Sequence, residues 1–554
     1  MKCGTISPGR YDPAISNELK APPVVPDFGP DETLSQGEVF DRLSYETMEL
    51  GHLKDLLDKC RLDLGRISLQ RAIAHPPEKS NDTRARQAAL AELSAKPDMV
   101  KSLDQLLDET SRDEKGLFEL SWHNFGGITG GNAHDPLSIG GFGYQQFKHT
   151  RRLMRSLNDF GANIGTATSP FLNGLYDDLR ALKDSHYFKL VDGPACVTES
   201  GPVLKADKPW YRPGYKFRPT LFKPLLLAII VLLAVGFKYA SGYFLTGTMP
   251  DSLRAVYGIV GLIAIFGIIP IIYLYATLIG NMERDAFMKP TGRALFTDDT
   301  ALRALDALGE LELLYCHLKY KDAFPSVTAL PEIIDAGHHT FEAEDLRSPI
   351  IGMEDQGYVG NDITFDLSRL SFITGPNSGG KTALSKSICQ NQVLAQMGGY
   401  VTARSARISN ALQIFYQVPQ AGELSRGEGR FATELARTRD IFFHTSKDAL
   451  VVLDEPFEGT SFEERLETSE QVLDGFIRLE ATVLFITHNH ALARLYRDKD
   501  DGDKTQFLEA SFENDNPTHK FKTGIASTSH AARIANEIGF GHEDIQRRFE
   551  KEES

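Results

Sequence analysis

Hydrophobic positions follow a helical period in the first part of the chain. Over residues 43–120 apolar side chains recur three and four positions apart, as in "MELGHLKDLLDKCRLDLGRISLQRAIA", and this spacing is typical of amphipathic helices. The glycine-rich stretch "NFGGITGGNAHDPLSIGGFG" interrupts the pattern, which resumes over residues 145–186 and again over residues 300–320. The sequence therefore predicts a helical domain with more than one layer of helices.

Two long apolar runs separate the parts of this helical pattern. Residues 225–245 hold one charged side chain, Lys238, and residues 255–280 hold none. The second run exceeds the roughly 20 residues that cross the hydrocarbon core of a bilayer. Basic residues flank both runs, which by the positive-inside rule places the flanks in the cytoplasm. The pattern predicts a transmembrane helical hairpin with both soluble parts cytoplasmic; the alternative is an apolar hairpin buried in the protein or in a dimer interface.

From Phe341 onward, short β-rich runs alternate with helical ones. This alternation is expected of an α/β domain with a parallel sheet. A phosphate-binding loop stands near its start, because "LSFITGPNSGGKT" is an apolar strand followed by the pattern GxxxxGK[ST] and then by a helical run. In that setting Lys381 neutralises the β and γ phosphates and Thr382 supplies a hydroxyl to Mg²⁺. We expect ATP and Mg²⁺ as cofactors, held by Gly375, Pro376, Asn377, Ser378, Gly379, Gly380, Lys381 and Thr382.

Two later strands carry candidate catalytic residues. The strand in "ALVVLDEP" brings Asp454 and Glu455 to its C-terminal end, where ligands of open α/β sheets bind. We expect Asp454 to hold Mg²⁺ through water, and Glu455 to orient or deprotonate the attacking water. "TVLFITHNH" ends in His488, a candidate sensor of the γ-phosphate. The alternatives are that the two carboxylates cap the next helix and that the histidine is structural.

Composition narrows the range of functions. The formal net charge of -15 argues against a broadly basic surface for nucleic acid but allows a local basic patch. The five cysteines show no CxxC spacing, so neither a disulfide framework nor a zinc site is indicated and a reducing compartment is favoured. No cleavable signal peptide is recognisable at the N-terminus.

The order of the motifs resembles that of the MutS family of mismatch-repair ATPases. The segments "TGPNSGGKT", "LAQMGGYVTA", "DEPFEGTS" and "ITHNH" are similar to motifs of that family in the same order. The resemblance implies composite ATP sites, each sandwiched between the two ATPase domains of a homodimer. Through the segment "YVGND", it also implies that Tyr358 lies against the adenine and that Asn361 lies near the edge of the base.

Three positions depart from the family's pattern. In "LSRGEGRFATEL", Gly429 and Arg430 stand where the family has Ser and Thr, and in "DEPFEGTS" Glu458 stands where the family has Arg. The family's serine reaches across the dimer to the partner's γ-phosphate, and Gly429 still offers a backbone N–H at this position. The departures leave a nucleotide-regulated membrane scaffold with little hydrolysis as an alternative function.

The helical part resembles the lever domain of the same family. This resemblance begins near Leu43, so the family's mismatch-recognition and connector domains are expected to be absent, and the apolar hairpin stands where the family inserts a DNA-gripping clamp. The expected domains are an irregular N-terminal arm (1–42), a helical lever-like domain (43–218 and 283–340), the transmembrane hairpin (219–282) and a MutS-type P-loop ATPase domain with a C-terminal helical dimerisation segment (341–554).

The expected fold class is thus an α-helical lever domain with an inserted transmembrane hairpin, followed by an α/β P-loop NTPase domain. The expected function is that of a membrane-anchored, homodimeric MutS-like ATPase whose nucleotide state moves the lever helices, and through them the membrane segments or an unknown protein partner. Family membership favours DNA as a ligand, whereas the missing mismatch reader and the acidic charge argue against mismatch recognition, so direct DNA binding stays open. An ABC-type transport-associated ATPase is a further alternative, although "LSRGEGR" lacks an LSGGQ-type signature.

Overall fold

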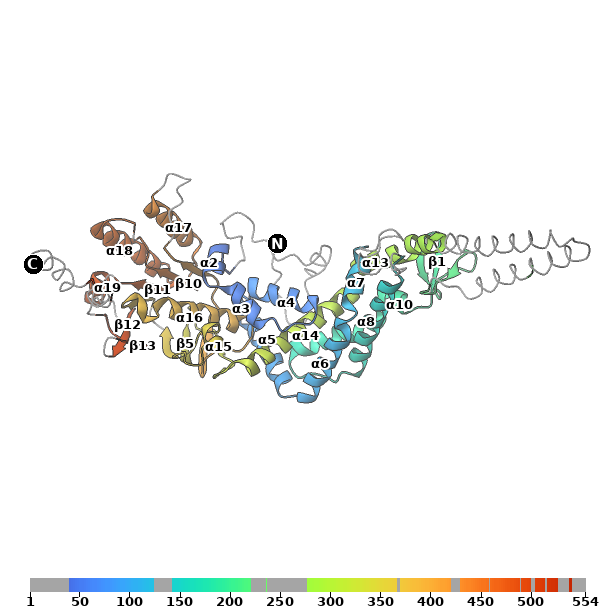
Figure 1. Ribbon diagram of the computed structural model, residues 1–554, viewed down its shortest axis with the longest axis horizontal. Coiled ribbons are helices and arrows are strands. Elements are labelled where there is room, and N and C mark those ends of the chain that lie inside the picture. The colour runs from blue at the N-terminus through green and yellow to red at the C-terminus, as the bar shows by residue number, and fades with distance from the viewer. Residues whose placement is uncertain are drawn as a thin grey trace, which may run out of the picture.

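The structure is a computed structural model in which a helical region precedes an α/β region (Figure 1). This order of regions agrees with the prediction from the sequence. The residues described are 39–123, 142–220, 236, 277–365, 369–419, 429–457, 459–488, 490–499, 504–513, 516–526 and 538–540, without the side chain of Asn377.

Local capping signals start several helices of the helical region. The hydroxyl of Ser169 accepts a hydrogen bond from the N–H of Leu172 (3.3 Å) ahead of Pro170, and the carboxylate of Asp298 accepts one from Ala301 (2.9 Å). Such caps satisfy N–H groups that the first helical turn leaves unpaired. The helices are α2 (Arg42–Thr47), α3 (Leu50–Leu57), α4 (Asp63–Ala74), α5 (Ser80–Ser94), α6 (Pro97–Ser111), α7 (Glu114–Ser121), α8 (Tyr144–Asn163), α9 (Pro170–Ala181), η2 (Leu182–Asp184), α10 (His186–Asp192), η3 (Arg284–Met288), α13 (Lys289–Ala294), η4 (Leu295–Thr297) and α14 (Asp299–Ala323).

The helix α14 is the centre of this region. Its side chains are buried almost all round, because α3, α4, α5 and α9 pack against it. Figure 1 shows α14 among α4, α5 and α6. A helix that is apolar on most sides must be enclosed by other elements, and α14 meets this condition inside the protein.

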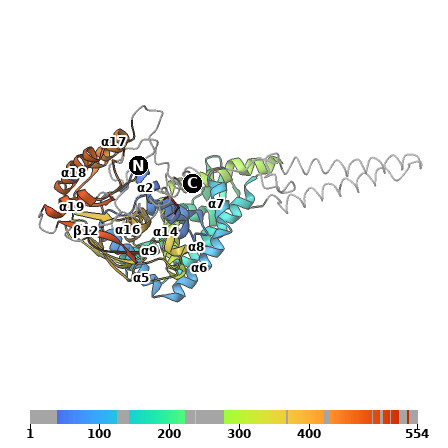
Figure 2. The ribbon, with the colours of Figure 1, turned by 60° about the vertical axis from the view of Figure 1, so that its left-hand side comes forward.

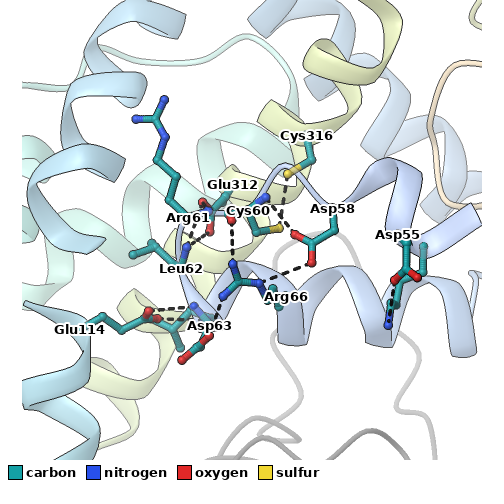
Figure 3. Close-up of polar contacts among 12 residues, drawn as sticks. Asp55, Asp58, Cys60, Arg61, Leu62, Asp63, Arg66, Glu114, Glu312 and Cys316 are labelled. Carbon is teal, nitrogen blue, oxygen red and sulfur yellow. Dashed lines mark hydrogen bonds and ion pairs between the residues drawn. The ribbon is translucent and has the colours of Figure 1, made fainter. Parts of the chain in front are cut away.

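Two carboxylates from other helices hold the start of α4 (Figure 3). Glu312 on α14 accepts a hydrogen bond from the N–H of Arg61 (2.6 Å), and Glu114 on α7 accepts from Asp63 (2.7 Å) and Leu64 (2.9 Å). The first N–H groups of a helix have no partner within the helix. Here acidic side chains distant in sequence supply those partners, so α4 is fixed to both α7 and α14.

The sequence analysis did not predict the small antiparallel sheet that follows α10. It has the order β2-β1-β3, with β1 (Ala195–Thr198), β2 (Gly201–Leu204) and β3 (Tyr215–Lys216). Figure 1 shows it at the end of the helical region away from the α/β region. Its strands are two to four residues long, too short to give a readable alternation in the sequence.

The α/β region is built on a six-stranded sheet with the order β13-β12-β7-β11-β10-β9. All neighbouring strands are parallel except β12 and β13. Strands β7, β10 and β11 are buried along their whole length, as expected for parallel strands covered on both faces. The bounds are β7 (Leu370–Thr374), β9 (Ile414–Gln417), β10 (Leu450–Asp454), β11 (Thr482–Thr487), β12 (Thr505–Glu513) and β13 (Asn516–Thr523).

Alternate side chains of the central strands enter two different cores. Ile373 and Val452 pack with residues of α16 (Lys381–Gln396), whereas Phe372 and Leu453 pack with residues of three other helices. These are α17 (Arg430–His444), α18 (Phe462–Arg478) and α19 (His490–Asp498), which Figure 2 shows together on one side of the strands. The two-residue period of a strand explains the division.

A second sheet lies on the α16 side, where its residues share a core with that helix. It has the order β4-β8-β5-β6. Its strands are β4 (Glu332–Ile334), β5 (Phe341–Leu346), β6 (Asn361–Phe365) and β8 (Ser405–Ser409), with the short helix α15 (Ile351–Glu354) between β5 and β6. The loop before β6 contacts α16, because the hydroxyl of Tyr358 lies 3.2 Å from that of Ser387.

The transmembrane part of the expected fold and the membrane localisation are wrong. Within the described ranges, no helix combines the length and the apolar character needed to cross a bilayer. The longest described helix, α14, has 25 residues, but it carries charged side chains such as Glu310 and Glu312 and buries its apolar residues against other helices. The prediction rested on runs 225–245 and 255–280, which lie outside the described residues apart from positions 236 and 277–280.

Candidate nucleotide-binding site

The phosphate loop joins the end of β7 to the start of α16 through η5 (Asn377–Gly379). Gly375 (φ 133°) and Gly380 (φ 87°) have positive φ angles, which glycine adopts without steric cost. A Cβ on Gly379 would lie 2.6 Å from the Cβ of Ala510 on β12, so the close approach of loop and strand requires glycine there. The loop ends at the N-terminus of α16, where unpaired N–H groups and the helix dipole favour an anion.

Lys381 is enclosed by this loop and is only 2% exposed. Its Nζ donates a hydrogen bond to the carbonyl of Gly375 (2.9 Å) and lies 3.6 Å from Oε1 of Glu455. Burial lowers the pKa of Lys381, against the opposing effect of Glu455 and Asp454. A buried ammonium in a glycine-rich loop at a helix N-terminus suits the phosphates of a nucleotide, so the loop fits such a ligand.

Thr382 and Asp454 form the oxygen pair expected at a Mg²⁺ site. The hydroxyl of Thr382 donates to Oδ2 of Asp454 (2.8 Å) at the end of β10. Burial raises the pKa of Asp454, the hydrogen bond from Thr382 lowers it, and the negative charge of Glu455 raises it further. Mg²⁺ prefers oxygen ligands and usually keeps several waters. The pair fits that cation, which would also offset the cost of burying two neighbouring carboxylates.

Glu455 lies between Lys381 and His488. Its Oε1 is 3.4 Å from Nδ1 of His488, which follows the end of β11, and its backbone N–H donates to Ile486 (3.0 Å). Glu455 has a φ of 49°, a conformation that costs a non-glycine residue of order 1–3 kcal/mol. The turn after β10 thus directs the carboxylate toward the phosphate loop, and the predicted residues Lys381, Thr382, Asp454, Glu455 and His488 meet at one edge of the sheet.

The loop expected to contact the base is held against α16 and β13. The hydroxyl of Tyr358 is 3.2 Å from that of Ser387 on α16. Asn361 donates to the carbonyl of His519 (3.0 Å) and accepts from the N–H of Phe521 (2.9 Å). Both polar atoms of the Asn361 amide therefore join β6 to β13, and this residue has a structural role in addition to any contact with a base.

His519 is a residue of this site that the sequence analysis missed. A Cβ on Gly380 would lie 3.4 Å from Nδ1 of His519, so the imidazole lies beside the last residue of the phosphate loop. The φ of His519 is 56°. No motif spacing marks this histidine, because it reaches the loop only through the antiparallel return of β13 along β12.

Gly429 lies apart from these residues as the position before α17. A Cβ built on it would meet no atom within 4 Å, so it occupies an open position. The next residue, Arg430, donates through Nε to the buried carboxylate of Glu434 (2.8 Å). Within one chain, the described contacts do not bring Gly429 to the phosphate loop. Glu458 lies outside the described residues.

Comparison with known proteins gives one family and several relatives. Residues 371–553 match the family model of MutS domain V. The DNA mismatch repair protein MSH3 of Yarrowia lipolytica is 30% identical over 244 residues, which are 44% of this chain and 24% of that protein. The DNA mismatch repair protein MutS of Myxococcus xanthus is 26% identical over 499 residues, 81% of this chain and 51% of the relative.

In another relative, the similarity covers a larger part of this chain. The DNA mismatch repair protein MutS of Caldicellulosiruptor saccharolyticus is 22% identical over 543 residues, 89% of this chain and 58% of the relative. The distant relationship therefore includes most of the helical region as well as the α/β region. The chain spans between about a quarter and somewhat over half of the length of these relatives.

Proposed function

We propose that this protein, whose residues 371–553 match the family model of MutS domain V, is an ATPase that binds ATP with Mg²⁺ and hydrolyses it. The observation that carries the proposal is the meeting of Lys381, Thr382, Asp454 and Glu455 at the C-terminal edge of parallel strands. A lysine in a phosphate loop, a hydroxyl beside a carboxylate and a second carboxylate are the groups that P-loop phosphoryl transfer uses.

Each residue has a defined role in this proposal. Lys381 and the N–H groups of the loop hold the β and γ phosphates, and Thr382 and Asp454 hold Mg²⁺ directly and through water. When bound, Mg²⁺ neutralises charge on the phosphate oxygens. Glu455 orients or deprotonates the attacking water, and His488 senses the γ-phosphate from the other side of Glu455. Tyr358 lies against the adenine.

The open position of Gly429 supports a homodimer with composite sites. We propose that the N–H of Gly429 from one subunit meets the γ-phosphate held by the other. ATP then favours the closed dimer because it binds that state better than the open one. Closure moves the helical region, which is joined to the α/β region through α14 and α3.

The names of the relatives indicate that duplex DNA is the ligand on which the ATP-driven movement acts. The relatives are named DNA mismatch repair proteins, and the similarity to two of them covers the helical region. The match to MutS domain V favours a MutS-type ATPase over an ABC-type transport ATPase. One observation supports the alternative of a nucleotide-regulated scaffold with little ATP hydrolysis. Arg430 is paired with Glu434 within its own chain.

The experiment is an assay of phosphate release from ATP by the full chain, together with ATP binding and light scattering. It is run with Mg²⁺ and with no DNA, matched duplex or mismatched duplex, beside Lys381→Ala. We expect Mg²⁺-dependent turnover that Lys381→Ala abolishes, and a dimer that ATP favours. ATP-dependent dimerisation without turnover would support the scaffold, whereas absence of ATP binding would refute the proposal. A faster rate of ATP hydrolysis in the presence of duplex DNA would identify DNA as the ligand. Absence of DNA binding at low salt would exclude DNA as the ligand.

A further inference from the structure

Two cysteines lie in contact where the segment before α4 meets α14, and Figure 3 shows their sulfur atoms facing each other. The Sγ atoms of Cys60 and Cys316 are 3.3 Å apart, although 256 positions separate the two residues along the chain. Both thiols are free in the structure. A disulfide has an S–S distance of about 2.05 Å, so the two sulfurs need to approach by roughly 1.2 Å to form one.

The chain around Cys60 allows this approach. Residues 58–62 form a non-helical link between the end of α3 and the start of α4, whereas Cys316 is fixed within the long helix α14. The N–H of Cys60 donates to Oδ1 of Asp58 (3.0 Å) and not to a helical carbonyl. Small changes of φ and ψ in the link can therefore move Cys60 without breaking the hydrogen bonds of a helix.

The two thiols differ in exposure, which sets the order in which they react. Cys60 is 8% exposed and Cys316 is 1% exposed, so a small oxidant reaches Cys60 first. The thiolate is the reactive form of a cysteine, and the hydrogen bond with Cys316, together with burial, raises the pKa of Cys60 far above its usual value. The pair therefore reacts slowly at neutral pH and requires a sustained supply of oxidant.

We propose that Cys60 and Cys316 form a redox modification site, at which a peroxide converts the two thiols into a disulfide. Sγ of Cys60 attacks the O–O bond of hydrogen peroxide, which releases one water and leaves a sulfenic acid. Sγ of Cys316 then attacks the sulfur of Cys60, forms the S–S bond and displaces a second water. The two sulfurs lose two electrons to the peroxide oxygens, and the two thiol protons end in the two waters.

The disulfide lies at the border between two hydrophobic cores. Cys60 and Cys316 belong to the core that contains α16 and strands of the α/β region. Their near neighbours along the chain, Leu62 and Tyr315, belong to the core of the helical region. The chain after α3 and the helix α14 thus pass from one core into the other at this point, and the disulfide would tie these two connections to each other.

The start of α3 is attached directly to the phosphate-loop helix α16. Nζ of Lys386 lies 2.7 Å from Oε1 of Glu49, and Nε2 of Gln390 donates to the carbonyl of Met48 (2.8 Å). Under the proposed function, closure of the dimer moves the helical region through α3 and α14. A disulfide between the end of the α3 segment and α14 restrains this movement, so oxidation slows ATP turnover. This consequence rests on the proposed function, whereas the formation of the disulfide does not.

The test treats the full chain with hydrogen peroxide and then with dithiothreitol, and non-reducing peptide mapping by mass spectrometry locates the disulfide. We expect the peptides of Cys60 and Cys316 to be linked and lighter by two hydrogen atoms. Cys389 on α16, which is 0% exposed, should keep its thiol. The link should form faster as pH rises, because the thiolate fraction increases, and dithiothreitol should reverse it.

Two single variants test the order of the steps. Cys316→Ser leaves Cys60 without its partner thiol, and we expect dimedone to trap the sulfenic acid on Cys60. Cys60→Ser leaves Cys316 protected by its burial, and we expect no dimedone adduct there. Neither variant should form the disulfide. The peptide map of the wild type decides whether the site exists even if a variant does not fold.

ATP turnover of the oxidised wild type measures the restraint. We expect a loss of about 5-fold or more, the lower end of the usual coupling between sites, which dithiothreitol reverses and Cys60→Ser does not show. Equal turnover of oxidised and reduced wild type would overturn the restraint. Absence of the linked peptides, or a lasting sulfenic acid on wild-type Cys60, would overturn the modification site. Absence of turnover in the reduced protein would refute the proposed function and the restraint with it, while the peptide map would still decide the disulfide.

Discussion

Buried carboxylates occur in both regions of the molecule, and their partners differ. In the helical region, Glu310 lies between Arg71 (2.6 Å) and Arg86 (2.7 Å). Burial alone would raise the pKa of Glu310, but the two arginines hold it below its usual value. In the α/β region burial raises the pKa of Asp454, and its neighbour Glu455 adds to this effect.

We call the cluster around Glu310 closed, because its charges are balanced within the chain, and the cluster around Asp454 open, because its charges are not balanced. The charges around Glu310 are balanced by arginines of the same chain, so nothing further is needed to make the cluster stable. At the phosphate loop, two carboxylates face one buried lysine, and the raised pKa of Asp454 indicates incomplete compensation. A cation and a phosphate chain would complete that balance. The two clusters therefore differ in their balance of charge, and only the one at the phosphate loop leaves room for a bound cation.

The sharpest test of the open cluster is Glu455→Gln. Loss of a general base or water-orienting carboxylate costs about 10²–10⁴-fold in rate, whereas the neutral amide removes the repulsion that raises the pKa of Asp454. We expect turnover to fall by this factor, ATP binding to persist and an ATP-bound dimer to accumulate. Single-turnover phosphate release and light scattering measure both effects. A rate within a few-fold of wild type would remove Glu455 from the chemistry.

The corresponding test of the closed cluster is Glu310→Gln. Removing one member of a buried ion pair leaves uncompensated charge and costs about 3–5 kcal/mol. We expect urea unfolding to show a loss of this size, whereas folded protein keeps its turnover rate. Glu46→Gln is the control, because Glu46 forms an exposed pair with Arg42, and such pairs contribute little. Equal stability of the two variants would contradict the comparison.

A third test asks whether a second subunit completes the open cluster. Gly429 has a φ of -67°, which proline shares, so Gly429→Pro removes the backbone N–H with little change of conformation. Gly429→Ala keeps the N–H and meets no atom. If this N–H binds the partner's γ-phosphate, the proline variant loses about 10²-fold in turnover and its ATP-dependent dimer, and the alanine variant loses neither. Identical behaviour of the two variants would exclude the contact.

The parts of the site that could be predicted are those encoded in short continuous segments. Strand, loop and helix follow one another from Leu370 to Gln396, and "LVVLD" is a buried strand ending in Asp454. Parallel strands bring such ends to one edge of a sheet. Motif spacing is therefore sufficient to predict that Lys381, Thr382 and Asp454 lie together.

Residues brought in by tertiary pairing could not be predicted in this way. His519 reaches the loop only because β13 returns beside β12. The contacts of α2 with β9, and of its N-cap residue Asp41 with α17, join residues hundreds of positions apart. The membrane prediction rested on hydrophobic length alone, and no helix among the described residues meets that criterion.

The remaining test is a dependence of stability on pH from the carboxyls at the start of α4 (Figure 3). Burial raises the pKa of Glu114 to about 8 and that of Glu312 to about 7, although both accept backbone hydrogen bonds. The unfolded value is about 4.3, so the folded state binds these protons more tightly. The resulting stability is fully present below about pH 4 and is lost as pH rises through about 7 and about 8.

Urea unfolding between pH 5 and 9 measures this slope, which is at most about 1.4 kcal/mol per pH unit for each carboxyl. The double variant Glu114→Gln, Glu312→Gln keeps an oxygen acceptor at each position and should flatten the dependence. A slope that persists would implicate Asp454, whose pKa burial also raises. Mg²⁺ and ATP should then suppress the remaining slope, because they would bind beside Asp454 and compensate its charge.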